Sequence, residues 1–151
     1  MTDSVLKVKI KRLRPGVSIP AYATEGSAAV DLRAAIGEPL TLNPGERALI
    51  PTGLAMEPEA QDVVALICAR SGLSIKHGIT LTNSVGVIDR DYRGEIGVAL
   101  INNGSEAYTV MPDERIAQMM FLPIARAAFL EVSDLEDTER GDGGFGSTGT
   151  K

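Results

Sequence analysis

One stretch, NSVGVIDRDYRGEI, combines residue types that can bind a planar base and activate water. Apolar segments flank residues 89–94, which predicts a hairpin whose tip carries carboxylates and a tyrosine. The amide of Asn83 offers one donor and one acceptor, as the edge of uracil requires. Asp89 can act as a general base toward water, and Tyr92 can pack on a sugar and exclude a 2′-hydroxyl. An ordinary polar turn is the alternative interpretation.

A second stretch, ARSGLSIKHGI, has the features of an anion site. Arg70, Ser71 and Gly72 come where a predicted strand gives way to a short helix. The first N–H groups of a helix have no partner within the helix, so this position favours an anion. An Arg–Ser–Gly turn with Ser71 as the N-cap explains the same residues equally well.

Two further stretches place polar groups on predicted strands. GSAAVDLRA puts Asp31 and Arg33 on the same face of a strand, and DERIAQMMF begins with Arg115 and Gln118. Charged strand residues are usually solvated, so each stretch alone is a weak indication of a site.

The last twelve residues, RGDGGFGSTGTK, are rich in glycine and cannot fold alone, because glycine loses much backbone entropy on ordering. The glycines match G-x-G-x-x-G, but no helical pattern follows, so a dinucleotide fingerprint is excluded. Glycine N–H groups can still approach phosphates closely, and Arg140 can donate two hydrogen bonds to one. Phe145 can stack on a base, and Ser147 and Thr148 add hydroxyl donors. An acidic, glycine-rich tail without a ligand is the alternative.

Composition excludes several classes of protein. The chain has 151 residues, 44% hydrophobic and 23% charged, with a net charge of −5 that argues against binding nucleic acid. One cysteine and one histidine exclude the usual zinc sites, so any metal is expected to be a hard cation held by oxygen. No apolar run approaches the roughly 20 residues of a membrane helix, and we expect a cytoplasmic protein.

The elements that must position these residues are predicted to be strands. Short β-prone segments recur about every ten residues with turn residues between them. The pattern predicts an all-β fold, a distorted jelly-roll or β-barrel with at most one short helix, after Ser71. Asn102-Asn103-Gly104 predicts a hairpin. Residues 1–134 are expected to form the folded core, and residues 135–151 a mobile C-terminal arm.

The five stretches occur in one chain in a fixed order: GSAAVDLRA, ARSGLSIKHGI, NSVGVIDRDYRGEI, DERIAQMMF and RGDGGFGSTG. In this order they resemble the trimeric deoxyuridine triphosphate nucleotidohydrolases, over almost the whole chain. The resemblance implies a β jelly-roll that forms a homotrimer, with sites shared between subunits and the arm closing over a neighbour's site. It implies hydrolysis of dUTP to dUMP and pyrophosphate, assisted by Mg²⁺ held mainly by the triphosphate. Such an activity keeps uracil out of DNA and supplies dUMP for thymidylate synthesis.

The resemblance also assigns roles by position. Asp89 is the expected catalytic base, and Asp31 and Arg115 are expected to support the site. The expected substrate contacts are Arg70, Ser71, Gly72, Asn83, Gly86, Ile88, Tyr92, Gln118, Arg140, Phe145, Gly146, Ser147 and Thr148. Two positions depart from the family pattern, Ala69 where proline is usual and Gly97 where a larger side chain is common. A dCTP deaminase of similar fold and a non-catalytic nucleotide-binding trimer are the alternatives.

Overall fold

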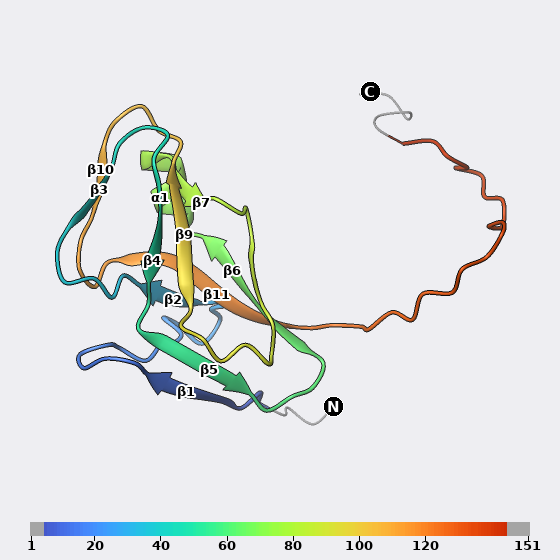
Figure 1. The fold of residues 1–151 in the computed structure, drawn as a ribbon, viewed down its shortest axis with the longest axis horizontal. Helices are drawn as coiled ribbons and strands as arrows, with labels where there is room; N and C mark the ends of the chain where they lie inside the picture. The colour runs from blue at the N-terminus through green and yellow to red at the C-terminus, as the bar shows by residue number, and fades with distance from the viewer. Residues whose placement is uncertain (1–4, 145–151) are drawn as a thin grey trace.

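A computed structural model describes residues 5–144 of the chain. These residues form strands and one short helix, α1 (Ser71–His77), as Figure 1 shows. In chain order the strands are β1 (Val8–Arg12), β2 (Val30–Arg33), β3 (Leu40–Leu42), β4 (Arg47–Pro51), β5 (Leu54–Pro58), β6 (Val63–Ala69), β7 (Ile79–Leu81), β8 (Gly86–Ile88), β9 (Gly97–Asn102), β10 (Tyr108–Val110) and β11 (Arg115–Pro123).

The described strands pair in four small antiparallel sheets. The largest has the order β2-β11-β6-β8, and the next has the order β4-β9-β7. Two further pairs, β1-β5 and β10-β3, complete the fold. The predicted all-β fold with one short helix is confirmed. Among the described residues the sheets do not close into a barrel. Of the two predicted forms, the structure therefore agrees with the jelly-roll.

Alternation of side chains explains how these strands build one core. In β6 the residues Val63, Ala65 and Ile67 are buried, and the residues between them are partly exposed. In β1 the lysines Lys9 and Lys11 are exposed, and the Val8 and Ile10 side chains that alternate with them are partly buried. The inward residues of the sheets meet in a single hydrophobic cluster that includes both large sheets. The polar face of each strand is therefore left for the site or for solvent.

Two predicted hairpins are not formed. β8 and β9 flank residues 89–96 but do not pair, because β8 pairs with β6 while β9 pairs with β4 and β7. β9 and β10 likewise flank the Asn-Asn-Gly turn without pairing, since β10 pairs with β3. The buried side chain of Asn102 explains the second case: its amide donates to the backbone oxygens of Leu42 and Glu106, both at 2.8 Å. The amide thus joins the segment before β10 to the end of β3, the strand with which β10 pairs.

The helix α1 is fixed at its C-terminal end by a close approach of two backbones. Gly78 has φ of 70° and ψ of 10°, and its N–H bonds to the last turn of the helix. Its carbonyl accepts a hydrogen bond from the N–H of Asn103 at 2.9 Å. A side chain on Gly78 would overlap the backbone of Gly104, so the two loops touch without side chains between them.

Residues 124–144 follow the last strand. Residues 124–144 contain no helix or strand and run away from the body in Figure 1. Phe129 in this segment is 95% exposed, and Leu130 and Leu135 are also exposed. No helix among residues 5–144 is long and apolar enough to cross a membrane. The predicted boundary between core and arm at residue 134 stays a prediction.

The close approach of Gly78 to Gly104 at the C-terminal end of α1 gives a test of the fold. Gly78→Ala is expected to lower the free energy of unfolding by at least about 2 kcal/mol, because alanine is strained at positive φ and would overlap Gly104. Gly37→Ala is the matched control, with open space around it, and its expected effect is within about 0.5 kcal/mol. Urea denaturation at one protomer concentration measures both. Equal losses in the two variants would contradict the close approach.

Candidate active site

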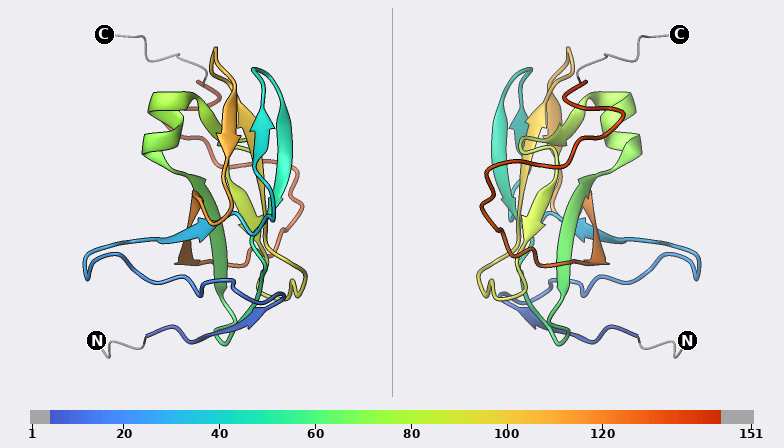
Figure 2. Two further views of the ribbon diagram at one scale, coloured as in Figure 1. Left: turned by 90° about the vertical axis from the view of Figure 1, so that its left-hand side faces the viewer. Right: turned by 90° about the vertical axis from the view of Figure 1, so that its right-hand side faces the viewer.

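Four polar side chains predicted from separate stretches meet around β11. Asp31 on β2 lies opposite Gln118 on β11, and Gln118 lies opposite Cys68 on β6. The side-chain amide of Gln118 donates to the backbone oxygen of Ala69 at 3.0 Å. Arg70 follows directly, so the end of β6 and the start of α1 are joined to β11 and β2. Figure 2 shows α1, β2 and β11 on the same side of the molecule.

A β-bulge brings Arg115 and Gln118 to one face. Residues three apart in a regular strand point to opposite faces. The pairing of β11 with β2 shifts register between Arg115 and Ala117, and both Ile116 and Ala117 are buried. The extra residue of the bulge therefore lets Arg115 and Gln118 face the same side as Asp31.

The carboxylate of Asp31 binds two guanidinium groups. Arg70 Nε donates to Asp31 Oδ1 at 2.8 Å, and Arg115 Nη1 donates to Asp31 Oδ2 at 3.3 Å. Arg70 Nη1 also donates to the backbone oxygen of Arg115 at 3.2 Å. The side chains of Asp31 and Arg70 are 26% and 27% exposed, and that of Arg115 is 50% exposed. Two cations on one anion leave a net positive charge that can bind an anionic ligand.

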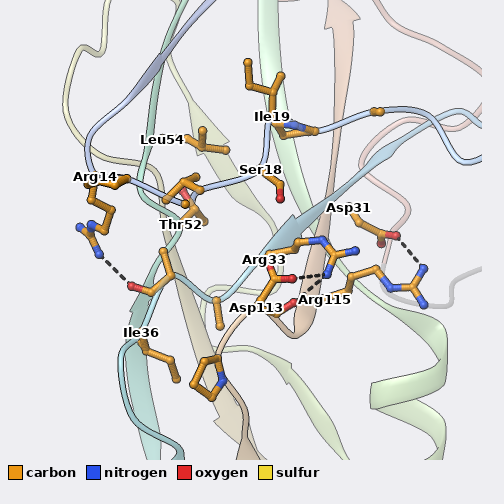
Figure 3. Close-up of a pocket in the computed structure, with 18 of the residues that line it drawn as sticks. Arg14, Ser18, Ile19, Asp31, Arg33, Ile36, Thr52, Leu54, Asp113 and Arg115 are labelled. Atoms are coloured by element: carbon orange, nitrogen blue, oxygen red, sulfur yellow. Dashed lines mark hydrogen bonds and ion pairs between the residues drawn. The ribbon is translucent and has the colours of Figure 1, made fainter.

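A cavity of about 670 Å³ opens beside this group. Figure 3 shows Asp31 and Arg115 at one end of it and the apolar side chains of Ile36 and Leu54 along its wall. Arg33 does not join the pair around Asp31. It donates instead to the carboxylate of Asp113 at 3.0 Å, although it shares a face with Asp31 as the sequence predicted.

Ser71 and Gly72 are the first two residues of α1, and both are exposed. The N-cap is Arg70, with φ of −87° and ψ of 129°, and its side chain makes no capping hydrogen bond. The alternative in which Ser71 caps the helix is therefore wrong. The side chain of Arg70 bonds to Asp31, and the exposed Ser71 and Gly72 follow it directly in the chain.

The second group of predicted residues lies along β8 and the loop that follows. Asn83 is exposed just after β7, next to a turn in which Ser84 has φ of 62°. Gly86 and Ile88 belong to β8, and a Cβ on Gly86 would lie 3.0 Å from Ile67 Cβ. Glycine at this position lets β8 lie close against β6. Asp89 is exposed where the strand ends.

The ring of Tyr92 is folded back on its own loop. Its hydroxyl donates to the backbone oxygen of Glu95 at 3.0 Å. A side chain on Gly94 would overlap the ring, so this glycine makes the folded-back position possible. The N–H of Tyr92 donates to the backbone oxygen of Asp89 at 3.1 Å, which closes a turn between the two site residues.

The two groups are far apart within one chain. Ile88 pairs with Ala65, five residues before Arg70 along β6. At about 3.3 Å per residue, this separation amounts to roughly 16 Å along the strand. Asp89 lies farther still, because β8 runs antiparallel to β6. The structure thus brings together Asp31, Arg70, Arg115 and Gln118 but does not bring Asp89 to them.

The C-terminal candidates lie mostly outside the described residues. Phe145, Gly146, Ser147 and Thr148 belong to the part of the chain that the structure does not describe. Arg140 is described, and its Nε donates to the backbone oxygen of Gly143 at 2.8 Å in a local turn. Within residues 5–144, no group of three His, Cys, Asp or Glu side chains could hold a metal ion.

Tyr108 on β10 lies near Arg70, and no sequence motif indicates it. Its hydroxyl donates to the carboxylate of Glu114, and its ring lies 4.9 Å from that of His77. Burial raises the pKa of Tyr108 above its ordinary value, and Glu114 raises it further, while nearby Arg70 lowers it. The phenol therefore remains a hydrogen-bond donor at neutral pH.

Comparison with known proteins gives the family. The family model described as dUTPase matches residues 16–149. The chain belongs to the dUTPase family. The deoxyuridine 5′-triphosphate nucleotidohydrolase of Hahella chejuensis is 52% identical to this family member over 147 residues, which cover 97% of each chain. That of Coxiella burnetii is 53% identical over 150 residues and 99% of each chain. The resemblance inferred from the five stretches is confirmed.

Solved dUTPases share the fold of this family member. A mutant dUTPase of Staphylococcus bacteriophage 80alpha with dUpNHpp superimposes with a TM-score of 0.85 at 26% identity, covering 95% of this chain and 99% of that one. A mutant dUTPase of phage phi11, described as revealing the coordination of a structural Mg(II) ion, gives a TM-score of 0.77 at 23% identity. It covers 87% of this chain and 99% of its own, and the likeness concerns the fold.

The free energy of unfolding can test the ion pairs that Asp31 makes with Arg70 and Arg115. Asp31→Asn is expected to lower the free energy of unfolding by about 1–3 kcal/mol, because two adjacent guanidinium groups lose their shared anion. Asp113→Asn is the matched control: it removes the exposed pair with Arg33, and asparagine tolerates the φ of 61° at this position. Its expected effect is below about 1 kcal/mol. Urea denaturation compares them, and the reverse order would contradict the ion-pair assignment.

Proposed function

We propose that this chain hydrolyses dUTP to dUMP and pyrophosphate, as a dUTP diphosphatase. The observation that carries the proposal is the guanidinium pair held by Asp31, in a chain whose relatives are named for this reaction over nearly their whole length. A triphosphate needs several positive and donor groups at fixed positions, and this pair offers them. The relatives carry the nucleotidohydrolase name, so the dCTP deaminase alternative is not favoured.

The phosphate chain would bind at the start of α1. Arg70, Ser71, Gly72 and Gln118 would contact the phosphates, with Asp31 and Arg115 supporting the position of Arg70. The hydrogen bonds of Asp31 to both arginines support this division of roles, because a guanidinium held by a carboxylate is already oriented when the ligand arrives.

The nucleoside would bind against β8. Asn83 and the backbone near Gly86 and Ile88 would recognise uracil, whose acceptor and donor match an amide. Tyr92 would pack on the deoxyribose, and its ring would leave no room for a 2′-hydroxyl. The close packing of Gly86 on Ile67 supports this role, since it makes the backbone of β8 a rigid edge.

Asp89 would act as the general base. It would orient a water molecule and take its proton as the oxygen attacks the α-phosphorus, so that the bond to the leaving pyrophosphate breaks. Mg²⁺ bound to the triphosphate would supply charge neutralisation for the leaving group. This ion would be held mainly by the substrate's own oxygens.

The site would be completed by other copies of the chain in a homotrimer. Asp89 of one chain lies more than about 16 Å along the sheet from Arg70 of the same chain, too far for both to act on one α-phosphate. A second subunit would therefore supply β8 and its loop. A third would lend residues 135–151, with Arg140, Gly146, Ser147 and Thr148 on the phosphates and Phe145 over the uracil.

The cellular role follows from the reaction. Removal of dUTP keeps uracil out of DNA, and the dUMP formed supplies thymidylate synthesis. Because its substrate belongs to the nucleotide pool, we place the protein in the cytoplasm. No nucleic acid or membrane is needed as a partner.

Pyrophosphate release tests the reaction and its base together. The parent protein with Mg²⁺ is expected to release pyrophosphate from dUTP and little from dCTP, and no ammonia, because cytosine would leave site groups mispaired.

Asp89→Asn is expected to lower kcat by at least about 100-fold while dUpNHpp still binds, since only proton transfer is lost. Asp91→Asn is the matched control and should keep most of the activity. Equal turnover by Asp89→Asn and the parent would exclude Asp89 as the base.

Deleting residues 140–151 tests the proposed arm. The truncated protein is expected to lose at least about tenfold in kcat/KM for dUTP, because closure over the triphosphate would be lost. Its unfolding midpoint should stay unchanged, because residues 140–144, the part of the deleted segment that the structure describes, belong to no helix or strand. Deleting residues 150–151 alone is the control and should have little effect. Full activity of the longer deletion would refute the lid.

A further inference from the structure

The loop that carries Asp89 and Tyr92 is not held by strand pairing between its two arms. β8 before it belongs to one sheet and β9 after it belongs to another. The hydroxyl of Tyr92 donates to the backbone oxygen of Glu95, so the position of the ring depends on where Glu95 is fixed. The groups that fix Glu95 lie in other parts of the chain.

The carboxylate of Glu95 is bound from two sides. Arg14 Nη2 donates to both of its oxygens, at 2.7 and 2.8 Å, and the N–H of Gly53 donates to Oε1 at 2.7 Å. The side chains of Glu95 and Arg14 are 29% and 39% exposed, so the pair is partly shielded from solvent. Three short hydrogen bonds from two donor groups, the Arg14 guanidinium and the Gly53 N–H, fix the carboxylate well.

Arg14 is itself anchored to the body. Its Nη1 donates to the backbone oxygen of Ala35 at 2.8 Å, and Figure 3 shows it at the edge of the cavity away from Asp31. The N–H of the neighbouring Leu13 donates to the backbone oxygen of Gly53 at 2.8 Å. The segment before β2 and the turn between β4 and β5 therefore act as one support for Glu95.

The backbone after Glu95 is held in the same way. The N–H of Ile96 donates to the backbone oxygen of Leu54 at 2.8 Å, and Ile96 is fully buried. The buried hydroxyl of Thr52 donates to the backbone oxygen of Ile96 at 2.7 Å. One end of the loop is thus rigid, and the Tyr92 ring is attached to that end.

We propose that Glu95, held by Arg14, is a positioning residue that sets the preference for deoxyribose over ribose. It touches no substrate. It fixes the backbone oxygen that holds the Tyr92 hydroxyl, and thereby the wall that excludes a 2′-hydroxyl. This inference rests on the proposed function, in which Tyr92 packs on the sugar.

The test is the ratio of kcat/KM for dUTP to kcat/KM for UTP. Glu95→Gln places an amide donor against Arg14 or the Gly53 N–H, which breaks the anchor without changing side-chain size. The ratio is expected to fall about tenfold, since small misplacements of positioned groups cost up to about 100-fold. Arg14→Lys keeps the charge but loses the second nitrogen, which anchors Arg14 to the backbone oxygen of Ala35, and the ratio should fall in the same direction. Glu46→Gln, whose carboxylate bonds only within its own turn, is the matched control and should leave the ratio unchanged.

A double-mutant cycle with Tyr92→Phe shows whether Glu95 acts through the tyrosine. Tyr92→Phe lacks the hydroxyl that bonds to Glu95, so adding Glu95→Gln should lower the ratio little further. Should Glu95→Gln fail to fold, Arg14→Lys carries the comparison. Lower unfolding temperatures with an unchanged ratio in both single variants would overturn the inference and leave the proposed function intact. A parent protein that does not hydrolyse dUTP would overturn both.

Discussion

The carboxylate of Asp31 between two guanidinium groups is the interaction on which the site depends. Without it Arg70 and Arg115 would repel each other at the point where three elements meet. Asp31 joins β2 to β11 and to the start of α1, so the same ion pairs that stabilise the fold also orient the positive groups. The partly buried position of Asp31 and Arg70 strengthens their pair relative to a surface one.

Local patterns in the sequence predicted the elements of this fold well. The short helix predicted after Ser71, which the structure places at Ser71–His77, and the recurrence of short strands both appear in the structure. Pairing was harder to predict, and both expected hairpins were wrong. Turn residues indicate where a chain bends, whereas the partner of a strand is chosen by distant residues. β8 pairs with β6, although α1 and β7 come between them in the sequence, and no turn residue indicates that pairing.

The candidate site was also predicted only in part, because local patterns indicate its residues but not the contacts between distant ones. Its residues were found because five stretches occur in order, and that order identified the family. The contacts that position these residues had no local signal: Asp31 and Arg70 are 39 positions apart, and the supporting pair Arg14 and Glu95 is 81 apart. The bulge that turns Arg115 toward Asp31 shows as two adjacent apolar residues, which a simple alternation does not reveal. Such supports become visible only when distant segments are placed together.

The contact between Gly78 and Gly104 restricts how this protein can vary. Each glycine would collide with the other's loop if it gained a side chain, because Gly104 also lies against the carbonyl of His77. A larger residue at one position cannot be compensated by a smaller residue at the other, because both positions already hold glycine, the smallest residue. In a combinatorial library these two positions should remain invariant together, and a loop graft between β9 and β10 should succeed only if it preserves this glycine-to-glycine junction.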